Sequence, residues 1–312
     1  MFETEDNQRA GVKVSRRRAM AALGGGAVAM TAASMGAAAD NDNDEAGLQF
    51  AIVSDTHLGR NDSKTPARQW RQAVEELAAM PVDFVLHLGD IVDRGREEQY
   101  PIYKEIRDGL GKPIYEIPGN HDPANLFAKH IRKTGDMSFV HRGIRFVLFG
   151  NARSDSHDGF IAGRQLEWIE AECAAAAKAQ QQVIICTHVP THTNRPPDRA
   201  WYVKPANGQT GFYEIMRRHE SRIAAVFQGH FHNGIRGWDD HAPAHEVIFP
   251  SLLYNRDRAL EAKKAPGYNL DEFRPGYVLA TISGSELLLR YKPLGAEVAA
   301  EKRLALPSGA AN

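Results

Sequence analysis

Cysteine is scarce in this chain of 312 residues, which contains only Cys173 and Cys186. Cys186 ends an apolar run that favours a buried strand, and Cys173 lies on an Ala-rich stretch just before that run. No motif places a base beside either thiol, so we do not expect either cysteine to be catalytic. Two small buried thiols are the favoured interpretation, although export of the protein would make a disulfide possible.

The chain also lacks an excess of charge of either sign. Its formal net charge is −1 at pH 7, from 38 Lys and Arg residues against 39 Asp and Glu residues. This balance gives no broad electrostatic reason to expect a nucleic acid or an acidic membrane surface as a partner. The composition, with 43% hydrophobic and 25% charged residues, is ordinary for a soluble globular protein.

The first 39 residues have the composition of a signal peptide. Ser15 and the arginines at 16–18 precede an uncharged stretch, residues 19–39, that is rich in Ala and Gly and ends in three alanines. A basic region, a weakly apolar region and a small-residue cleavage site are typical of such a signal. The arginine pair and the low hydrophobicity resemble a twin-arginine signal. We therefore expect export by the twin-arginine machinery, to the periplasm or the medium.

A disordered tail or an uncleaved membrane anchor is the alternative for this stretch. A stable anchor usually needs about 20 strongly apolar residues. Residues 19–39 contain too many small and polar side chains for that, and no later segment meets the requirement. We expect no stable membrane anchor.

Beyond the signal we expect an acidic linker at 40–47, one domain at 48–300 and a C-terminal tail at 301–312. Apolar runs alternate with helical periodicity through much of the domain. The expected strands are 48–53, 82–88, 113–117, 183–186 and 223–227, the helices are 66–80, 97–110, 164–179 and 211–219, and a hairpin joins 137–141 to 144–149. After Gly229 the pattern becomes β-rich, with strands at 234–238, 246–249, 277–282 and 286–291, for which antiparallel pairing fits. This pattern predicts an α/β fold with mostly parallel strands in its first part: two packed β-sheets flanked by helices.

Five short polar motifs each follow one of the apolar runs. In chain order they are Asp55-Thr56-His57, Gly89-Asp90-Ile91-Val92-Asp93, Gly119-Asn120-His121-Asp122, His188, and Gly229-His230-Phe231-His232. Residues two apart in an extended chain point the same way, so the two outer residues of Asp-x-His and of His-x-His can face one site. Open α/β folds place their sites at the carboxyl ends of strands. The five motifs can therefore gather along one sheet edge and supply carboxylates, imidazoles and one amide to two metal ions.

Together the motifs resemble the pattern of the calcineurin-like metallophosphoesterase superfamily, from Leu48 to about His232. The resemblance implies a four-layer αββα arrangement and two metal ions. One ion would be held by Asp55, His57, Asp90 and His232. The other would share Asp90 and be held also by Asn120, His188 and His230. In this family the residue that corresponds to His121 is not a ligand and serves the leaving group or the transition state.

Two divalent ions about 3.5–4 Å apart clamp a phosphate ester and activate a bridging water, whose pKa falls toward 7. The hydroxide attacks phosphorus in line with the leaving oxygen, and an imidazole at His121 is suited to stabilise the developing charge. Nitrogen and oxygen ligands without a thiolate suit Mn, Fe or Zn, as divalent or mixed-valence ions. A tyrosine at the position of Asp93 would indicate a purple acid phosphatase, and its absence argues against that variant.

Several residues near the motifs leave alternatives open. Asp93 is expected outside the ligand set, and Asp122 either orients the ring of His121 or is a turn residue. His192 could reach the substrate, but a solvated loop position is the favoured interpretation. In the same loop, Trp201 and Tyr202 could stack on a base or cover an apolar edge. Three basic residues of this loop could contact phosphate or lie in solvent: Arg195, Arg199 and Lys204.

The sequence therefore predicts a metal-dependent hydrolase of small phosphomonoesters or phosphodiesters that acts outside the cytoplasm, with no nucleic acid as its partner. Residues 163–169 resemble a helix of cyclic-nucleotide phosphodiesterases, which makes that activity an alternative. However, Val189 follows His188 where many of those enzymes carry a second histidine. A protein of a different class, inactive but with the same fold, is a further alternative, although every expected ligand is present here. A zinc β-lactamase-like hydrolase would need His-x-His-x-Asp-His, which the sequence lacks.

Overall fold

The structure is a computed structural model that describes residues 47–62, 64–194, 199–234, 244–256 and 273–308. The expected signal peptide, nearly all of the expected linker and most of the strand expected at 234–238 lie outside these residues.

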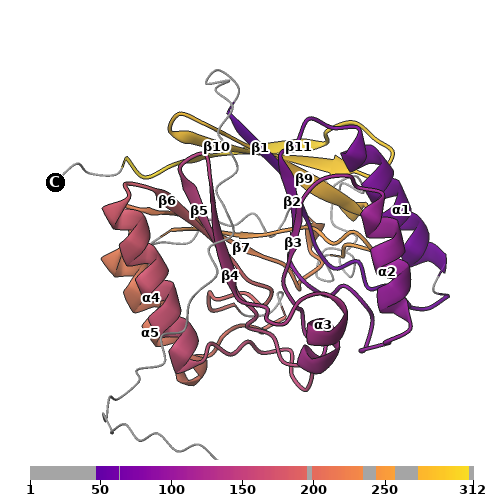
Figure 1. The fold of residues 1–312 in the computed structure, drawn as a ribbon, viewed down its shortest axis with the longest axis horizontal. Coiled ribbons are helices and arrows are strands. Elements are labelled where there is room, and N and C mark those ends of the chain that lie inside the picture. The colour runs from indigo at the N-terminus through magenta and orange to yellow at the C-terminus, as the bar shows by residue number, and fades with distance from the viewer. Residues whose placement is uncertain (1–46, 63, 195–198, 235–243, 257–272, 309–312) are drawn as a thin grey trace, which may run out of the picture. The chain divides into compact units, whose positions relative to one another are not determined.

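Two β-sheets lie at the centre of the described domain (Figure 1). The first has the strand order β11-β10-β9-β1-β2-β3. Its strands are β1 (Leu48–Val53), β2 (Phe84–His87), β3 (Ile114–Glu116), β9 (Gly276–Ser283), β10 (Glu286–Pro293) and β11 (Ala300–Ala305). β1, β2 and β3 pair in parallel, whereas β9, β10 and β11 form an antiparallel extension next to β1.

The second sheet has the strand order β4-β5-β6-β7-β8. Its strands are β4 (Met137–His141), β5 (Ile144–Leu148), β6 (Gln182–Cys186), β7 (Ile223–Gln228) and β8 (His245–Ile248). β5 to β8 are parallel, and β4 joins β5 in the expected hairpin. Each sheet therefore contains a set of parallel strands whose carboxyl ends lie along one edge of that sheet.

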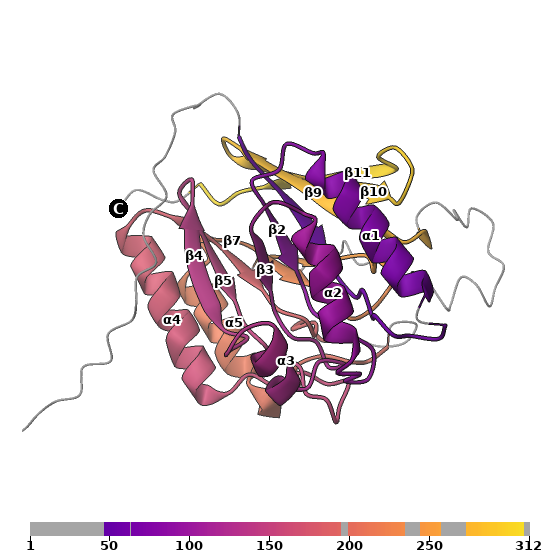
Figure 2. The ribbon, with the colours of Figure 1, turned by 45° about the vertical axis from the view of Figure 1, so that its right-hand side comes forward.

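Helices cover the outer face of each sheet (Figures 1 and 2). α1 (Lys64–Ala78) and α2 (Gln99–Asp108) pack on the first sheet, while α4 (Gly163–Lys178) and α5 (Gln209–Arg218) pack on the second. The expected four-layer αββα arrangement is thus confirmed. Two short helical segments, α3 (Ala124–His130) and the 3-10 turn η1 (Pro205–Asn207), complete the described helices. Within the described ranges, no helix is both long and apolar enough to cross a membrane.

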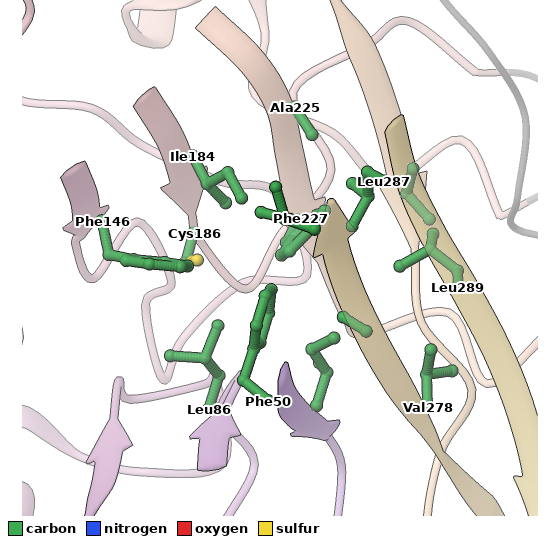
Figure 3. Close-up of a cluster of buried hydrophobic side chains, with 14 of the residues drawn as sticks. Phe50, Leu86, Phe146, Ile184, Cys186, Ala225, Phe227, Val278, Leu287 and Leu289 are labelled. Carbon is green, nitrogen blue, oxygen red and sulfur yellow. The ribbon is translucent and has the colours of Figure 1, made fainter. Parts of the chain in front are cut away.

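The period-two alternation of strand residues divides the hydrophobic side chains between two layers of core. On β1, Phe50 and Ile52 face the cluster between the sheets, whereas Ala51 and Val53 face the helices of the first sheet. The inter-sheet cluster is built around aromatic rings, and Phe50 lies at its centre (Figure 3). Burial of both faces explains why these strands appear in the sequence as continuous apolar runs.

Three details differ from the sequence-based expectations. β8 pairs with β7 in parallel and belongs to the second sheet, so antiparallel pairing after Gly229 holds only for β9 to β11. β11 pairs with β10 over six residues, so the domain continues past the expected boundary at residue 300. α3 was not expected, because its seven residues are too short to show a clear helical period.

Both cysteines are free thiols and are buried. Cys173 faces the core under α4, and Cys186 faces the core between the sheets. Burial raises the pKa of Cys173 to about 12 and raises the pKa of Cys186 as well. The two residues are therefore inert core side chains, as the sequence indicated.

We expect Phe50→Ala to lower the free energy of unfolding by about 3–5 kcal/mol, because it removes a buried aromatic side chain and leaves a cavity. The ring of Phe50 stacks on Phe84 at 5.2 Å between centroids and meets Phe146 edge-on at 5.3 Å. Urea denaturation followed by circular dichroism measures the change. Phe160→Ala is the control, since that side chain is 40% exposed, and its effect should stay within about 1 kcal/mol. Equal losses in the two variants would contradict the assignment of Phe50 to the core.

Candidate metal centre

The five motifs meet where parallel strands of both sheets end. The first three follow β1, β2 and β3, whereas His188 and the Gly-His-Phe-His motif follow β6 and β7 of the second sheet. The expectation of a single sheet edge is therefore corrected, because the site is shared between two sheets. His188 Nδ1 contacts the carbonyl of Leu88 at 2.6 Å, and the N–H of His230 donates to Asp55 Oδ2 at 3.1 Å. These contacts join the two sheets at the site.

Four buried side chains form a first cluster, in which their ligand atoms lie within 4.8 Å of one another: Asp55, His57, Asp90 and His232. His232 Nε2 lies 3.0 Å from Asp55 Oδ1 and 3.1 Å from His57 Nε2. The other oxygen of Asp55 accepts hydrogen bonds from the Ser54 hydroxyl (2.5 Å) and from the N–H of His230. Only Oδ1 of this carboxylate is thus directed into the cluster.

Asp90, His188 and His230 form a second cluster, so Asp90 belongs to both. Asp90 Oδ2 lies 3.3 Å from His57 Nε2 and 3.4 Å from His188 Nε2. Its Oδ1 accepts a hydrogen bond from the N–H of His121 at 2.8 Å. One carboxylate oxygen therefore stands between an imidazole of the first cluster and an imidazole of the second.

Each of the four imidazoles has one nitrogen near an oxygen acceptor. The contacts are His57 Nδ1 to Asp93 Oδ1 (3.3 Å), His188 Nδ1 to Leu88 O (2.6 Å), His230 Nε2 to His157 O (3.1 Å) and His232 Nδ1 to Tyr254 O (3.1 Å). A nitrogen held by such an acceptor carries the proton, so the second nitrogen of the neutral ring presents a lone pair. Histidines that bind metals are oriented in this way.

The backbone at these residues adopts a conformation that L-amino acids rarely take. Five candidate ligands have a positive φ: Asp55 (57°), His57 (45°), Asp90 (54°), His230 (75°) and His232 (55°). A non-glycine residue in this region carries strain, and such strain concentrates at functional sites. The chain turns sharply after β1, β2 and β7, which lets both residues of the Asp-x-His and His-x-His pairs reach the centre.

The charges of the clusters compensate one another. Burial alone would raise the pKa of Asp90, but His188 and His57 outweigh it and hold that pKa well below its usual range. Burial would likewise lower the pKa of His188, and Asp90 reverses this effect and raises it to about 9. Proximity to His188 thus compensates the charge of the buried carboxylate, and a bound cation would take over that role and leave the ring neutral.

The donor set fits a metal ion. Asn120 Oδ1 is buried and has no hydrogen-bond partner among the described residues, and Asp55 Oδ1 and His188 Nε2 are buried without a well-directed hydrogen bond there, although they lie 3.0 Å from His232 Nε2 and 3.4 Å from Asp90 Oδ2. Buried polar atoms without partners are rare, because each costs the free energy of its lost hydration. Cations would satisfy all three atoms, and nitrogen and oxygen donors of this kind suit divalent ions such as Mn, Fe and Zn.

His121 lies beside the first cluster, where its ring meets that of His57 edge-on at 4.5 Å between centroids. The N–H of Arg94 donates to His121 Nδ1 at 3.0 Å, and Asp93 Oδ1 lies 3.2 Å from the same atom. Asp93 also lies 3.3 Å from His57 Nδ1, the nitrogen that faces away from the first cluster. His57, Asp93 and His121 thereby form a third group whose side chains could hold a cation, so the place of Asp93 outside the ligand set stays a prediction. Burial lowers the pKa of His121, but the carboxylates of Asp90 and Asp93 outweigh it and raise that pKa.

Asp122 does not orient His121. Its carboxylate accepts hydrogen bonds from the N–H groups of Ile91 (2.9 Å), Val92 (3.1 Å) and Gly119 (2.9 Å). It therefore ties together the loops after β2 and β3, and Asp93 is the acidic neighbour of the His121 ring. Of the two interpretations of Asp122, the turn residue is the one that the geometry supports.

The sequence favoured a solvated position for His192, and this prediction is wrong. His192 is buried, and its Nδ1 lies 3.5 Å from Glu246 Oε2.

Trp201 lies next to the site, with its ring centroid 5.2 Å from that of His230. Sequence reasoning missed His157, whose ring stacks on Trp201 at 4.0 Å. No pattern in the sequence marks His157, because it lies in a loop far from the motifs.

The sequence profile of calcineurin-like phosphoesterases matches residues 48–234, more than half of the chain. The protein therefore belongs to the calcineurin-like phosphoesterase family, and its expected class, a metal-dependent hydrolase of phosphoric esters, is confirmed.

Curated relatives are phosphodiesterases. The chain is 24% identical to a 3′,5′-cyclic-nucleotide phosphodiesterase of Nostoc sp. over 206 residues, which covers 62% of this chain and 75% of that one. It is 25% identical to the glycerophosphodiester phosphodiesterase GpdQ of Enterobacter lignolyticus over 163 residues, 48% of this chain and 56% of that one. Among solved structures, a dimetal phosphatase from Danio rerio has the same fold, with a TM-score of 0.65 and 14% identity over 84% of this chain and 99% of that one.

Gly119→Ala should disrupt the centre, because a Cβ at this position would overlap the carboxylate of Asp90. We expect weaker metal retention and a loss of activity of about a hundredfold, as is common when a reacting group is displaced by about 1 Å. Metal analysis and phosphodiester hydrolysis measure the two effects. Gly163→Ala is the matched control, since no atom lies within 4 Å of a Cβ added there. Similar activity in both variants would contradict the close contact between Gly119 and Asp90.

Proposed function

We propose that this protein hydrolyses phosphodiesters at a centre of two divalent metal ions, most suitably Mn, Fe or Zn. The observation that carries the proposal is the position of Asp90 Oδ2 between His57 Nε2 (3.3 Å) and His188 Nε2 (3.4 Å) of the two clusters. One ion would be held by Asp55, His57, Asp90 and His232. The other would be held by Asp90, Asn120, His188 and His230.

When bound, such ions supply positive charge that neutralises a phosphate and lowers the pKa of water. His121 belongs to neither proposed ligand set, and its side chain is 17% exposed beside an otherwise buried centre. It is therefore placed to stabilise the charge of the reacting phosphate or to donate a proton to the leaving oxygen. Its Nδ1 faces Asp93 Oδ1 and the N–H of Arg94, and it either donates to the carboxylate or accepts from the N–H, so in both tautomers Nε2 is left for that contact.

The names of the curated relatives favour diesters over monoesters. The Nostoc protein is named for cyclic nucleotides and the Enterobacter protein for glycerophosphodiesters, and both of these substrates are phosphodiesters. We therefore place phosphodiesters first, with cyclic nucleotides among the candidates, and phosphomonoesters second.

We also propose that the protein acts outside the cytoplasm, in the periplasm or the medium. The support is the sequence of residues 15–39: an arginine cluster, a weakly apolar stretch and three alanines before Asp40. The twin-arginine machinery exports chains that have already folded. Such export would suit this protein, because its proposed metal ligands come from both halves of the domain and meet only after folding.

In the metal-loaded protein, we expect His121→Ala to lower kcat for bis(p-nitrophenyl) phosphate by about 10²–10⁴, the usual contribution of a general acid. Because His121 is outside both ligand sets, this variant should retain about two equivalents of metal, the number implied by a two-metal centre. Asp90→Ala should lose both activity and metal, since it removes a ligand common to the two clusters.

Asp108→Ala is the control for the Asp90 variant, because the side chain of Asp108 is 69% exposed. It should match the unaltered protein in both measurements. A wild-type protein that binds manganese, iron or zinc but cleaves neither bis(p-nitrophenyl) phosphate nor p-nitrophenyl phosphate would overturn the proposed activity. Full metal occupancy in Asp90→Ala would overturn the proposed ligand set.

Changing Arg16 and Arg17 together to Lys should keep the full-length chain in the cytoplasm of a bacterium that has the twin-arginine pathway. A twin-arginine signal is read by its receptor through the arginine pair, so equal charge does not replace it. Immunoblots of cell fractions measure the distribution, and Arg9→Lys is the matched control. Undiminished export of the double variant would exclude this route.

A further inference from the structure

A pair of stacked aromatic rings lies beside the metal centre. The imidazole of His157 stacks on the indole of Trp201, with centroids 4.0 Å apart and planes at 12°. Trp201 is partly buried, whereas His157 is exposed. One face of the His157 ring is thus covered by the indole, and the residue remains open to solvent.

This pair borders the second cluster. The ring of His230 lies 5.2 Å from that of Trp201 and 5.8 Å from that of His157, between centroids. His230 Nε2 also contacts the carbonyl of His157 at 3.1 Å.

The loops that carry the two rings are fastened to each other. Lys204 Nζ lies 3.2 Å from Asp158 Oδ1, and the N–H of Gly159 donates to the carbonyl of Tyr202 at 3.3 Å. The ammonium of Lys204 also lies 3.5 Å from the centroid of the Tyr202 ring. The stacked pair is therefore held in place before any ligand arrives, which reduces the entropic cost of binding on it.

We propose that the His157–Trp201 pair binds a flat aromatic group of the ester, such as a nucleobase, while the phosphate occupies the metal centre. This inference rests on the proposed function and narrows its substrate class. Aromatic rings bind the flat face of any base by stacking and do not discriminate between the different bases. A glycerol or an ethanolamine group has no flat face, so the pair favours nucleotide-like diesters over aliphatic ones.

Adenosine 5′-monophosphate and ribose 5-phosphate provide the sharpest test, because they share a sugar and a phosphate and differ only in the base. Their Kd values are measured by isothermal titration calorimetry on the manganese-loaded, full-length protein. We expect the nucleotide to bind roughly tenfold or more tightly than the sugar phosphate, from the usual strength of base stacking. In Trp201→Leu and in His157→Ala this ratio should fall to near one, while Trp201→Phe should keep part of it.

Phe160→Ala is the matched control, since Phe160 is an exposed aromatic residue in the same loop as His157, and it should leave the ratio unchanged. A ratio near one in the unaltered protein would overturn the inference. Equal weakening of both ligands in Trp201→Leu, together with loss of manganese, would also overturn it and would assign Trp201 a structural role at His230. Hydrolysis of bis(p-nitrophenyl) phosphate is measured separately, so failure of the proposed function is distinguished from failure of this inference.

Discussion

The site depends on a buried carboxylate, that of Asp90, which is shared by two groups of imidazoles. An ionised carboxylate away from water is tolerated only when positive charge or hydrogen-bond donors surround it. Here one oxygen accepts the N–H of His121, and the other faces His57 and His188. The remaining features of the centre follow from the need to hold these partners around one acidic group.

The fold meets that need through backbone geometry. Parallel strands of two packed sheets end at the same place, and the chain turns there through left-handed residues that direct short pairs of side chains inward. Gly119 and Gly229 let other segments approach, because a Cβ at either would overlap the carboxylate of Asp90 or the hydroxyl of Ser54. The hydrophobic cluster around Phe50 fixes the distance between the sheets and hence between the two sets of ligands.

Much of this could be predicted from the sequence, because buried strands leave continuous apolar runs and each motif follows one of them. Six of the seven candidate ligands meet in the two clusters as the spacing implied, and the seventh, Asn120, has a buried side-chain oxygen without a hydrogen-bond partner among the described residues. Contacts between side chains that are far apart in the sequence leave no comparable pattern in it. The position of Asp93 beside the His121 ring, the burial of His192 against Glu246, and the position of His157 all depend on contacts between distant segments. The parallel pairing of β8 with β7 and the pairing of β11 with β10 were missed for the same reason, because tertiary packing decides which strands become partners.

The division of the ligands between the sheets has a consequence for how the molecule matures. Asp55, Asp90 and Asn120 come from the first 75 residues of the described domain, whereas His188, His230 and His232 lie about 70 residues or more further along. During synthesis the early half emerges with carboxylates and an amide but only one of the four imidazoles. Tight binding of metal by the proposed ligands would therefore wait until the second sheet has docked, and bound ions would then link the two halves of the sandwich to each other.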